Sequence, residues 1–324
     1  MTMKIILIAL VVVLVVLLIA FFLGPRVEID TTLDSVELPP DLDAYLKDSE
    51  GRYTDIVPGT EKTIAWAGEK GRKTPLSIIY LHGFSASRQE TVPLTDRIAS
   101  TLGANLFYTR FAGHGRGGAA MAEGSVNDWL NDAYEALEIG RRLGDRVIVV
   151  GVSTGGSVAT WLGSLDSAQD IAAIVTISPN FGPIDWRSDI LLWPWGEALA
   201  NLIVGEEYSW EAQNEGHERY WTHRYPTKAL LTMMGLAHLA RSLELEAIET
   251  PILTLYSKED RLVSPRQIER AFQRIGSPRK RLIPFNQTGD GSHHVLAGDI
   301  LSPESTSEVA AMILSFIREN TGDL

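Results

Sequence analysis

Residues 146–161 read RVIVVGVSTGGSVATW, and this stretch decides the fold. A run of β-forming residues leads into Gly151-Val152-Ser153-Thr154-Gly155-Gly156, and a helix-like pattern follows. A strand that turns sharply into a helix brings the flanking positions too close for side chains, which is why glycine is used there. The pattern therefore predicts that Ser153 is pushed up at the edge of a sheet, at a helix N-terminus whose dipole favours negative charge.

The alternative reading of this glycine-rich turn is a phosphate-binding loop. A P-loop would place a lysine after the last glycine, and a dinucleotide site would show G-x-G-x-x-G. Neither pattern is present, so the turn favours a nucleophilic serine at position 153.

Apolar runs that predict strands alternate with segments of helical spacing along most of the chain. The predicted strands lie at 76–83, at the start of 104–115, and at 146–151, 171–179, 251–257 and 280–285. The predicted helices lie at 91–103, 126–144, 156–165, 265–276 and 304–319. This alternation is typical of an α/β fold with a parallel sheet covered by helices on both faces.

The alternation breaks over residues 181–245, where we expect a helical insertion without a clear strand. This segment holds five of the eight tryptophans of the chain. We therefore divide the chain into a core at 61–180 and 246–324, the insertion at 181–245, and a tether and entry segment at 25–60.

Residues 1–24 form the second strong signal. From Ile5 to Leu23 every residue is apolar, and Gly24-Pro25 follows. As a helix this run spans about 28 Å, close to the thickness of a bilayer's hydrocarbon core. A cleaved signal peptide is the alternative, but its apolar region is usually shorter and ends at a small-residue site. We expect an uncleaved membrane anchor, and Lys4 before the span places the catalytic domain on the extracytoplasmic side.

Charge and composition exclude several kinds of partner. The formal net charge is −12, with no basic runs, which argues against nucleic acid. The chain has no cysteine, and thus no disulfide, thiol nucleophile or Cys-ligated zinc. His217 and His223 are six apart, which does not fit a helical zinc pair. We therefore expect neither a metal nor another cofactor.

Taken together, these motifs resemble the α/β-hydrolase family over residues 50–320. The family places its catalytic groups in the chain order nucleophile, acid, histidine. After the predicted strand at 251–257, Asp260-Arg261-Leu262-Val263 is similar to the D-x-x-V that carries the family's acid. The resemblance implies Asp260 as the acid, with Glu259 as the alternative one position earlier.

The catalytic histidine should lie in the loop after the next strand. Ser292-His293-His294-Val295-Leu296 is similar to the S-x-H-V-[I/L] of small carboxylesterases and monoacylglycerol lipases, which implies His294 and leaves His293 as the alternative. His294 would be the general base for Ser153, and Asp260 would hold its tautomer.

The resemblance also implies an oxyanion hole made of two backbone N–H groups, those of Thr154 and Phe84. His82-Gly83 is similar to the H-G dipeptide that precedes this loop in the family. Many relatives carry Met or Gln at the position of Thr154, but the exchange leaves a backbone donor in place.

The resemblance implies a serine hydrolase that cleaves carboxylic esters through an acyl-enzyme, with the insertion at 181–245 as its cap or lid. An apolar or monoglyceride-like lipid ester is the favoured small-molecule substrate. A thioesterase or amidase would use the same triad, and an inactive α/β-hydrolase fold could serve as a binding module. Dehalogenases and epoxide hydrolases of this fold carry Asp at the position of Ser153.

Overall fold

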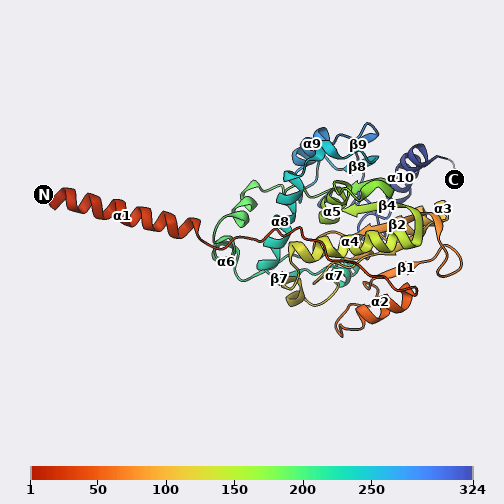
Figure 1. Ribbon diagram of the computed structural model, residues 1–324, viewed down its shortest axis with the longest axis horizontal. Helices are drawn as coiled ribbons and strands as arrows, with labels where there is room; N and C mark the ends of the chain where they lie inside the picture. The colour runs from red at the N-terminus through yellow and green to blue at the C-terminus, as the bar shows by residue number, and fades with distance from the viewer. Residues whose placement is uncertain (1, 323–324) are drawn as a thin grey trace.

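The computed structural model describes residues 2–322, which fold around a seven-stranded sheet (Figure 1). The strand order is β1-β3-β2-β4-β5-β8-β9, and all neighbouring strands are parallel except β1, which runs antiparallel to β3. The strands are β1 (Thr63–Ala65), β2 (Thr74–Leu81), β3 (Asn105–Tyr108), β4 (Gly144–Val152), β5 (Ile171–Ile177), β8 (Ile252–Tyr256) and β9 (Lys280–Pro284). The predicted mostly parallel sheet is confirmed, and the short antiparallel edge strand β1 was not predicted.

Helices cover both faces of the sheet, because the strands are apolar on both sides. Ile79 and Leu81 of β2 face one hydrophobic cluster, whereas Ile78 and Tyr80 face the other. The first cluster is covered by α4 (Val126–Leu143), α5 (Thr154–Gly163) and α9 (Pro265–Arg274). The second is covered by α3 (Leu94–Leu102) and α10 (Thr306–Thr321). Both clusters are fully buried, as a doubly covered parallel sheet requires.

The segment between β5 and β8 folds into short elements that lie beside the carboxyl ends of the strands. Its helices are α6 (Gly196–Val204), α7 (Glu215–Tyr220) and α8 (Lys228–Ser242). It also contains β6 (Glu207–Ser209) and β7 (Arg224–Pro226), which pair antiparallel. The expectation that residues 181–245 lack strands was therefore wrong. Three-residue strands are too short to show an alternating pattern.

Residues 25–41, which we call the strap, run along the body instead of hanging free. Their apolar side chains pack against the main hydrophobic cluster at Val27, Ile29, Leu33 and Leu38. The strap leads into α2 (Leu42–Glu50), which begins at the N-cap Asp41. Composition predicted only a tether here, whereas the structure shows a packed segment.

Helix α2 is tied to the core by a buried ion pair. The Glu50 carboxylate accepts hydrogen bonds from Arg110 Nε at 2.8 Å and from Nη2 at 2.7 Å. A bidentate pair of this kind is geometrically specific, so it fixes the end of α2 against the body.

The N-terminal helix α1 (Thr2–Phe22) projects from the body (Figure 1). Residues Met3–Phe22 are long and apolar enough to cross a membrane, and none of this stretch is buried against the protein. It is therefore not a core helix.

Candidate active site

Ser153 lies at a sharp turn between β4 and α5. Its backbone has φ 52° and ψ −117°, a region that L-residues rarely adopt. The turn is held by a hydrogen bond from Ser153 N to Ile177 O at 2.9 Å, and Ser153 O accepts from Gly156 N at 2.9 Å. Strain at a residue that lines a cavity is typical of a functional position.

The glycines beside Ser153 are required by space. A Cβ atom at Gly151 would lie 2.3 Å from Gly155 O, and one at Gly155 would lie 2.0 Å from Leu81 O. Real side chains do not approach backbone atoms this closely, so both positions exclude every other residue. The sequence predicted that side chains at these positions would come too close at a sharp turn, and the contacts at Gly151 and Gly155 are of this kind.

Asp260 and His294 meet at the carboxyl ends of β8 and β9. His294 Nδ1 lies 2.7 Å from Asp260 Oδ2, and the Asp260 side chain is fully buried. The other carboxylate oxygen accepts the N–H groups of Leu262 and Val263. Burial lowers the pKa of His294, but the negative charge of Asp260 outweighs it and raises that pKa above its usual value. The pair therefore presents Nε2 of an oriented imidazole to the cavity.

The two alternatives, His293 and Glu259, lie together outside this pair. His293 Nδ1 is 3.7 Å from Glu259 Oε2, and the Glu259 side chain is 58% exposed. Both histidines thus have an acidic partner, but only His294 and Asp260 are buried, and only His294 lines the cavity that Ser153 also lines.

The backbone N–H groups of Phe84 and Thr154 are free to bind an anion. Both residues line the cavity beside Ser153. Neither N–H donates to a protein acceptor within residues 2–322. The loop of Phe84 passes close to the serine, because a Cβ atom at Gly83 would lie 3.3 Å from Ser153 Cβ. This is the arrangement that an oxyanion hole needs.

His82 supports the loop of Phe84 through hydrogen bonds. Its Nε2 accepts the N–H of Phe111 at 3.1 Å, so Nδ1 carries the proton and donates to Gly83 O at 2.8 Å. Burial lowers the pKa of His82 to about 4, which keeps the ring neutral and the tautomer fixed.

The cavity is large and mostly apolar. Its volume is about 1270 Å³, above the range of about 300–1,000 Å³ usual for ligand sites. Four tryptophans of the insertion line it, namely Trp186, Trp193, Trp210 and Trp221. These side chains therefore form the pocket wall and do not merely pack the insertion on the core.

Glu90 is a site residue that the sequence did not reveal. It is 2% exposed, lines the cavity, and accepts hydrogen bonds at Oε1 from Gly83 N at 2.7 Å and Tyr80 Oη at 2.8 Å. Burial raises its pKa to about 8, so the carboxyl is mostly protonated at neutral pH. Glu90 follows Gln89 in a polar loop, and nothing in the local pattern signals that it is buried.

Asp290 organises the loop that carries His294. Its Oδ2 accepts the N–H groups of His294 and Val295, both at 2.9 Å, and its Oδ1 accepts from Gln213 Nε2 at 2.7 Å. Burial disfavours its charge, but these bonds and that of Ser292 lower its pKa to about 2. Because Gln213 belongs to the insertion, Asp290 also joins the histidine loop to the insertion.

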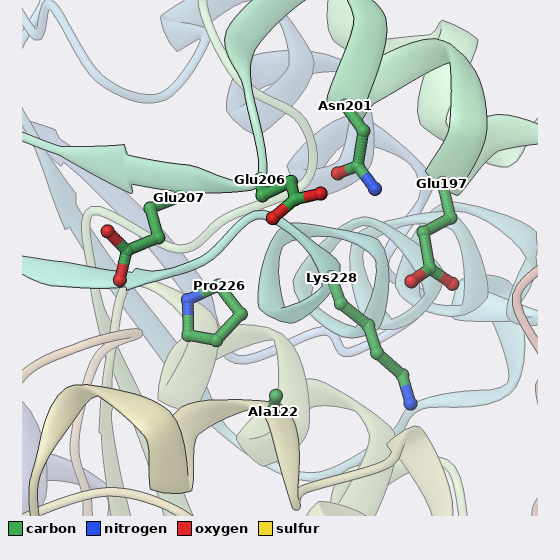
Figure 2. Close-up of a pocket in the computed structure, with 7 residues that line it drawn as sticks. All are labelled: Ala122, Glu197, Asn201, Glu206, Glu207, Pro226 and Lys228. Carbon is green, nitrogen blue, oxygen red and sulfur yellow. The ribbon is translucent and has the colours of Figure 1, made fainter.

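A second, shallower depression lies on the insertion (Figure 2). Figure 2 shows Lys228 between Glu197 and Glu206, with Glu207 turned away from them. Within residues 2–322, no cluster of three or more His, Cys, Asp or Glu side chains is arranged to hold a metal ion. This depression is thus lined by charged side chains, and we assign it no catalytic role.

Residues 73–297 match the family described as serine aminopeptidase, S33 (Hydrolase_4). Among curated proteins, the chain is 25% identical over 239 residues to the thermostable monoacylglycerol lipase of Bacillus sp. (strain H-257). This alignment covers 71% of the chain and 86% of the lipase. The matched residues include Ser153, Asp260 and His294 and the whole insertion between them.

Solved structures show the same fold. A structure of the metagenome-derived lipolytic enzymes LipS and LipT superposes with a TM-score of 0.68 at 24% identity, covering 82% of this chain and 99% of that one. A soluble variant of monoglyceride lipase from Saccharomyces cerevisiae, in complex with a substrate analogue, gives 0.60 at 12% identity over 82% and 97%. At these identities the likeness establishes the α/β-hydrolase fold alone.

Proposed function

Because the chain belongs to the serine aminopeptidase, S33 (Hydrolase_4) family, we propose that it hydrolyses carboxylic esters with Ser153 as nucleophile, His294 as general base and Asp260 as its partner. The observation that carries this proposal is the 2.7 Å contact between His294 Nδ1 and Asp260 Oδ2 at the cavity that contains Ser153. The matched monoacylglycerol lipase supports an ester, not a peptide, as the substrate.

In the first half of the reaction, Ser153 Oγ attacks the acyl carbon and its proton passes to His294 Nε2. The carbonyl electrons move to oxygen, where the N–H groups of Phe84 and Thr154 stabilise the negative charge. The tetrahedral intermediate then expels the alcohol, which takes the proton from His294, and an acyl-enzyme remains on Ser153.

In the second half, water replaces the alcohol. His294 Nε2 takes a proton from this water, whose oxygen attacks the acyl carbon. The second intermediate releases the carboxylic acid and returns the proton to Ser153 Oγ. Throughout, the Asp260 carboxylate stabilises the imidazolium without accepting its proton.

The favoured substrate class is an ester with a long apolar acyl chain, such as a monoacylglycerol. The cavity supports this class, because it is large and its tryptophan wall would bury an acyl chain. The curated relative is named as a monoacylglycerol lipase, which points the same way.

We further propose that α1 remains as an uncleaved membrane anchor with the catalytic body outside the cytoplasm. Its 20-residue apolar span supports an anchor over a signal peptide.

A fluorophosphonate probe tests the nucleophile on the full-length protein in detergent. We expect covalent labelling that Ser153→Ala abolishes, with the variant still folded by circular dichroism. Labelling that survives Ser153→Ala would contradict the assignment.

A substrate series tests the specificity on the same preparation. We expect kcat/KM to rise with acyl chain length and to include monoacylglycerols, while an aminoacyl anilide and an acyl thioester are turned over more slowly. Faster cleavage of the anilide would contradict the proposed esterase activity and favour the aminopeptidase activity that the family description names.

A further inference from the structure

The exposed apolar side chains of the body gather on the insertion. Outside α1, most of the large apolar residues with high exposure lie between residues 184 and 208, the others being Leu23, Tyr53 and Leu262. Leu202 is 83% exposed and Trp186 81%. We call the following set the cap face: Trp186, Trp193, Trp195, Leu202, Ile203 and Val204. Soluble surfaces rarely concentrate apolar residues in this way unless they meet a partner or a membrane.

The cap face is continuous with the end of the anchor. Trp195 Nε1 donates to Ala20 O at 3.3 Å, and Trp195 N donates to Pro25 O at 2.7 Å. Ala20 belongs to the last turn of the apolar span. A tryptophan at the end of a span is typical of the membrane–water interface, where its ring is apolar and its N–H finds a partner.

The start of the strap is held against the body by close contacts, so the chain between α1 and the body is not a loose tether. At Gly24 a Cβ atom would lie 2.1 Å from Trp195 Nε1, so the chain passes directly against the indole here. Three residues later, Val27 packs with Leu191 and Met234 of the insertion. Figure 1 shows the result, with α1 leaving the body beside α6, while α3 and α10 lie at the opposite end. A bilayer crossed by α1 therefore meets the cap face first.

Part of the cap face also forms the rim of the catalytic cavity, whereas Leu202 and Trp195 lie outside it. Trp186, Trp193 and Ile203 line that cavity and are 81%, 54% and 66% exposed. Side chains that both line a cavity and face outward stand at its mouth. The mouth therefore opens where the apolar surface is richest.

We propose that the cap face is a second membrane contact, seated at the headgroup–acyl boundary of the bilayer that α1 crosses, so that lipid esters enter the cavity directly from this bilayer. The proposal rests on the proposed anchor and esterase. It goes beyond them, because an anchor on a loose tether would leave the cavity mouth free to face water.

The partner is a bilayer surface that is bound by apolar burial and not by charge. The net charge is −12, and Glu197 lies on the same helix, α6, as Leu202, Ile203 and Val204, with Glu206 and Glu207 just after it. Anionic lipids would repel these carboxylates, whereas buried apolar area binds zwitterionic lipid equally well. Phosphatidylcholine vesicles are therefore the appropriate probe.

The chain has no cysteine, so a single introduced cysteine gives one unique labelling site. The full-length protein, reconstituted in phosphatidylcholine vesicles, would carry a fluorophore at Leu202→Cys on the cap face. Val15→Cys in α1 reports the anchor, and Asp145→Cys is the water-exposed control. Asp145 lies at the start of β4, at the edge of the sheet opposite the active site. We expect a nitroxide-labelled lipid to quench positions 202 and 15 but not 145.

The outcomes separate the two proposals. Quenching at position 15 without quenching at 202 would overturn the membrane contact and leave the anchor standing. Quenching at 202 without quenching at 15 would support the contact and overturn the anchor. No quenching at either position would overturn both.

A kinetic test uses Leu202→Asp, because Leu202 does not line the cavity. We expect turnover of a vesicle-borne monoacylglycerol to fall about fivefold or more, with hydrolysis of a short soluble ester unchanged. Gly68→Asp is the matched control, since it adds the same charge at an open site far from the insertion. Equal losses in both variants, or no loss in Leu202→Asp, would contradict the proposal. A wild-type protein that cleaves neither ester would instead contradict the proposed function.

Discussion

Glu90 Oε1 lies 2.7 Å from the main-chain nitrogen of Gly83, one residue before the N–H of Phe84. The neutral carboxyl therefore supports the loop of Phe84 without placing a charge beside the oxyanion hole that we propose. His294 and Tyr80 are the titratable groups nearest to it. As the pH rises through about 8, Glu90 ionises, and its charge opposes the oxyanion and raises the pKa of His294.

We predict that kcat/KM of the wild type falls above about pH 8 and that Glu90→Gln removes this fall. Glutamine keeps the acceptor for Gly83 N–H but does not ionise.

The Glu90→Gln variant should also change the pH dependence of stability. Because the folded pKa of Glu90 is raised from 4.5 to about 8, the native state holds more protons in that window, and its free energy of unfolding decreases as the pH rises. Glu90→Gln should flatten that decrease. An unchanged pH–rate profile would leave Glu90 with a structural role only.

The two adjacent histidines should behave very differently. We predict that His294→Ala lowers kcat by about 10⁴-fold or more, because it removes the base while the oxyanion donors remain. His293→Ala should keep activity within about threefold, since this side chain faces Glu259 at the surface. Ester turnover by the two purified variants decides between them, and the reverse pattern would move the base to His293.

Asp260 and His294 could be predicted to lie together because each follows a strand in a short motif. Parallel strands bring their carboxyl ends to one edge of the sheet, where His294 contacts Asp260 and lines the same cavity as Ser153. The elements that were missed are short or lie at the edge. β1 and β6 have three residues each, and a three-residue segment cannot show periodicity.

Helix α2 was missed for a different reason. Asp41 is a good N-cap, and Leu42, Tyr45 and Leu46 have helical spacing, but nine residues within a polar segment were read as part of a tether. Glu90 and Asp290 could not have been found at all. Their roles depend on burial and on main-chain N–H groups of distant loops, which leave no trace in the local sequence.

Asp290→Asn tests how the histidine loop is held. The carboxylate accepts five hydrogen bonds, from Gln213, Ser292 (backbone and hydroxyl), His294 and Val295. An amide keeps one acceptor oxygen and turns an NH₂ group towards donors, which leaves buried N–H groups unpaired at about 1–3 kcal/mol each. We expect kcat to fall about 10- to 100-fold with KM little changed. Serine labelling by the fluorophosphonate should slow in parallel, and unchanged kinetics would argue against a positioning role.

Gly155→Ala should prevent the elbow from forming. The new Cβ atom would lie 2.0 Å from Leu81 O, and both atoms belong to the rigid sheet and helix. We expect a loss of Tm of about 10 °C or more, or no folded protein. Gly68→Ala is the matched control, because nothing lies within 4 Å of its Cβ position, and it should change Tm by about 1–2 °C at most. A Gly155→Ala protein as stable as the control would show that the backbone shifts there at little cost.

Thr154 tests whether a side chain assists the proposed oxyanion hole. Its hydroxyl is buried without a hydrogen-bond partner, while its backbone N–H is the expected oxyanion donor. We predict that Thr154→Val keeps kcat within about threefold and leaves stability unchanged or slightly higher, because it removes only an unpaired polar group. A fall of about 10²–10³ in kcat would instead identify the hydroxyl as a donor to the oxyanion.

Because the strap is packed against the body, an anchored enzyme would meet its lipid substrate by lateral diffusion within one bilayer and not by diffusion through bulk water. With α1 in the bilayer and no slack before the body, the only membrane-borne esters that reach the enzyme are those that diffuse laterally past its mouth. Its rate should therefore follow the mole fraction of ester in the membrane and not the amount in bulk solution. Diluting the substrate with inert lipid should slow it even when the total substrate is constant, and a neighbouring vesicle should stay beyond its reach.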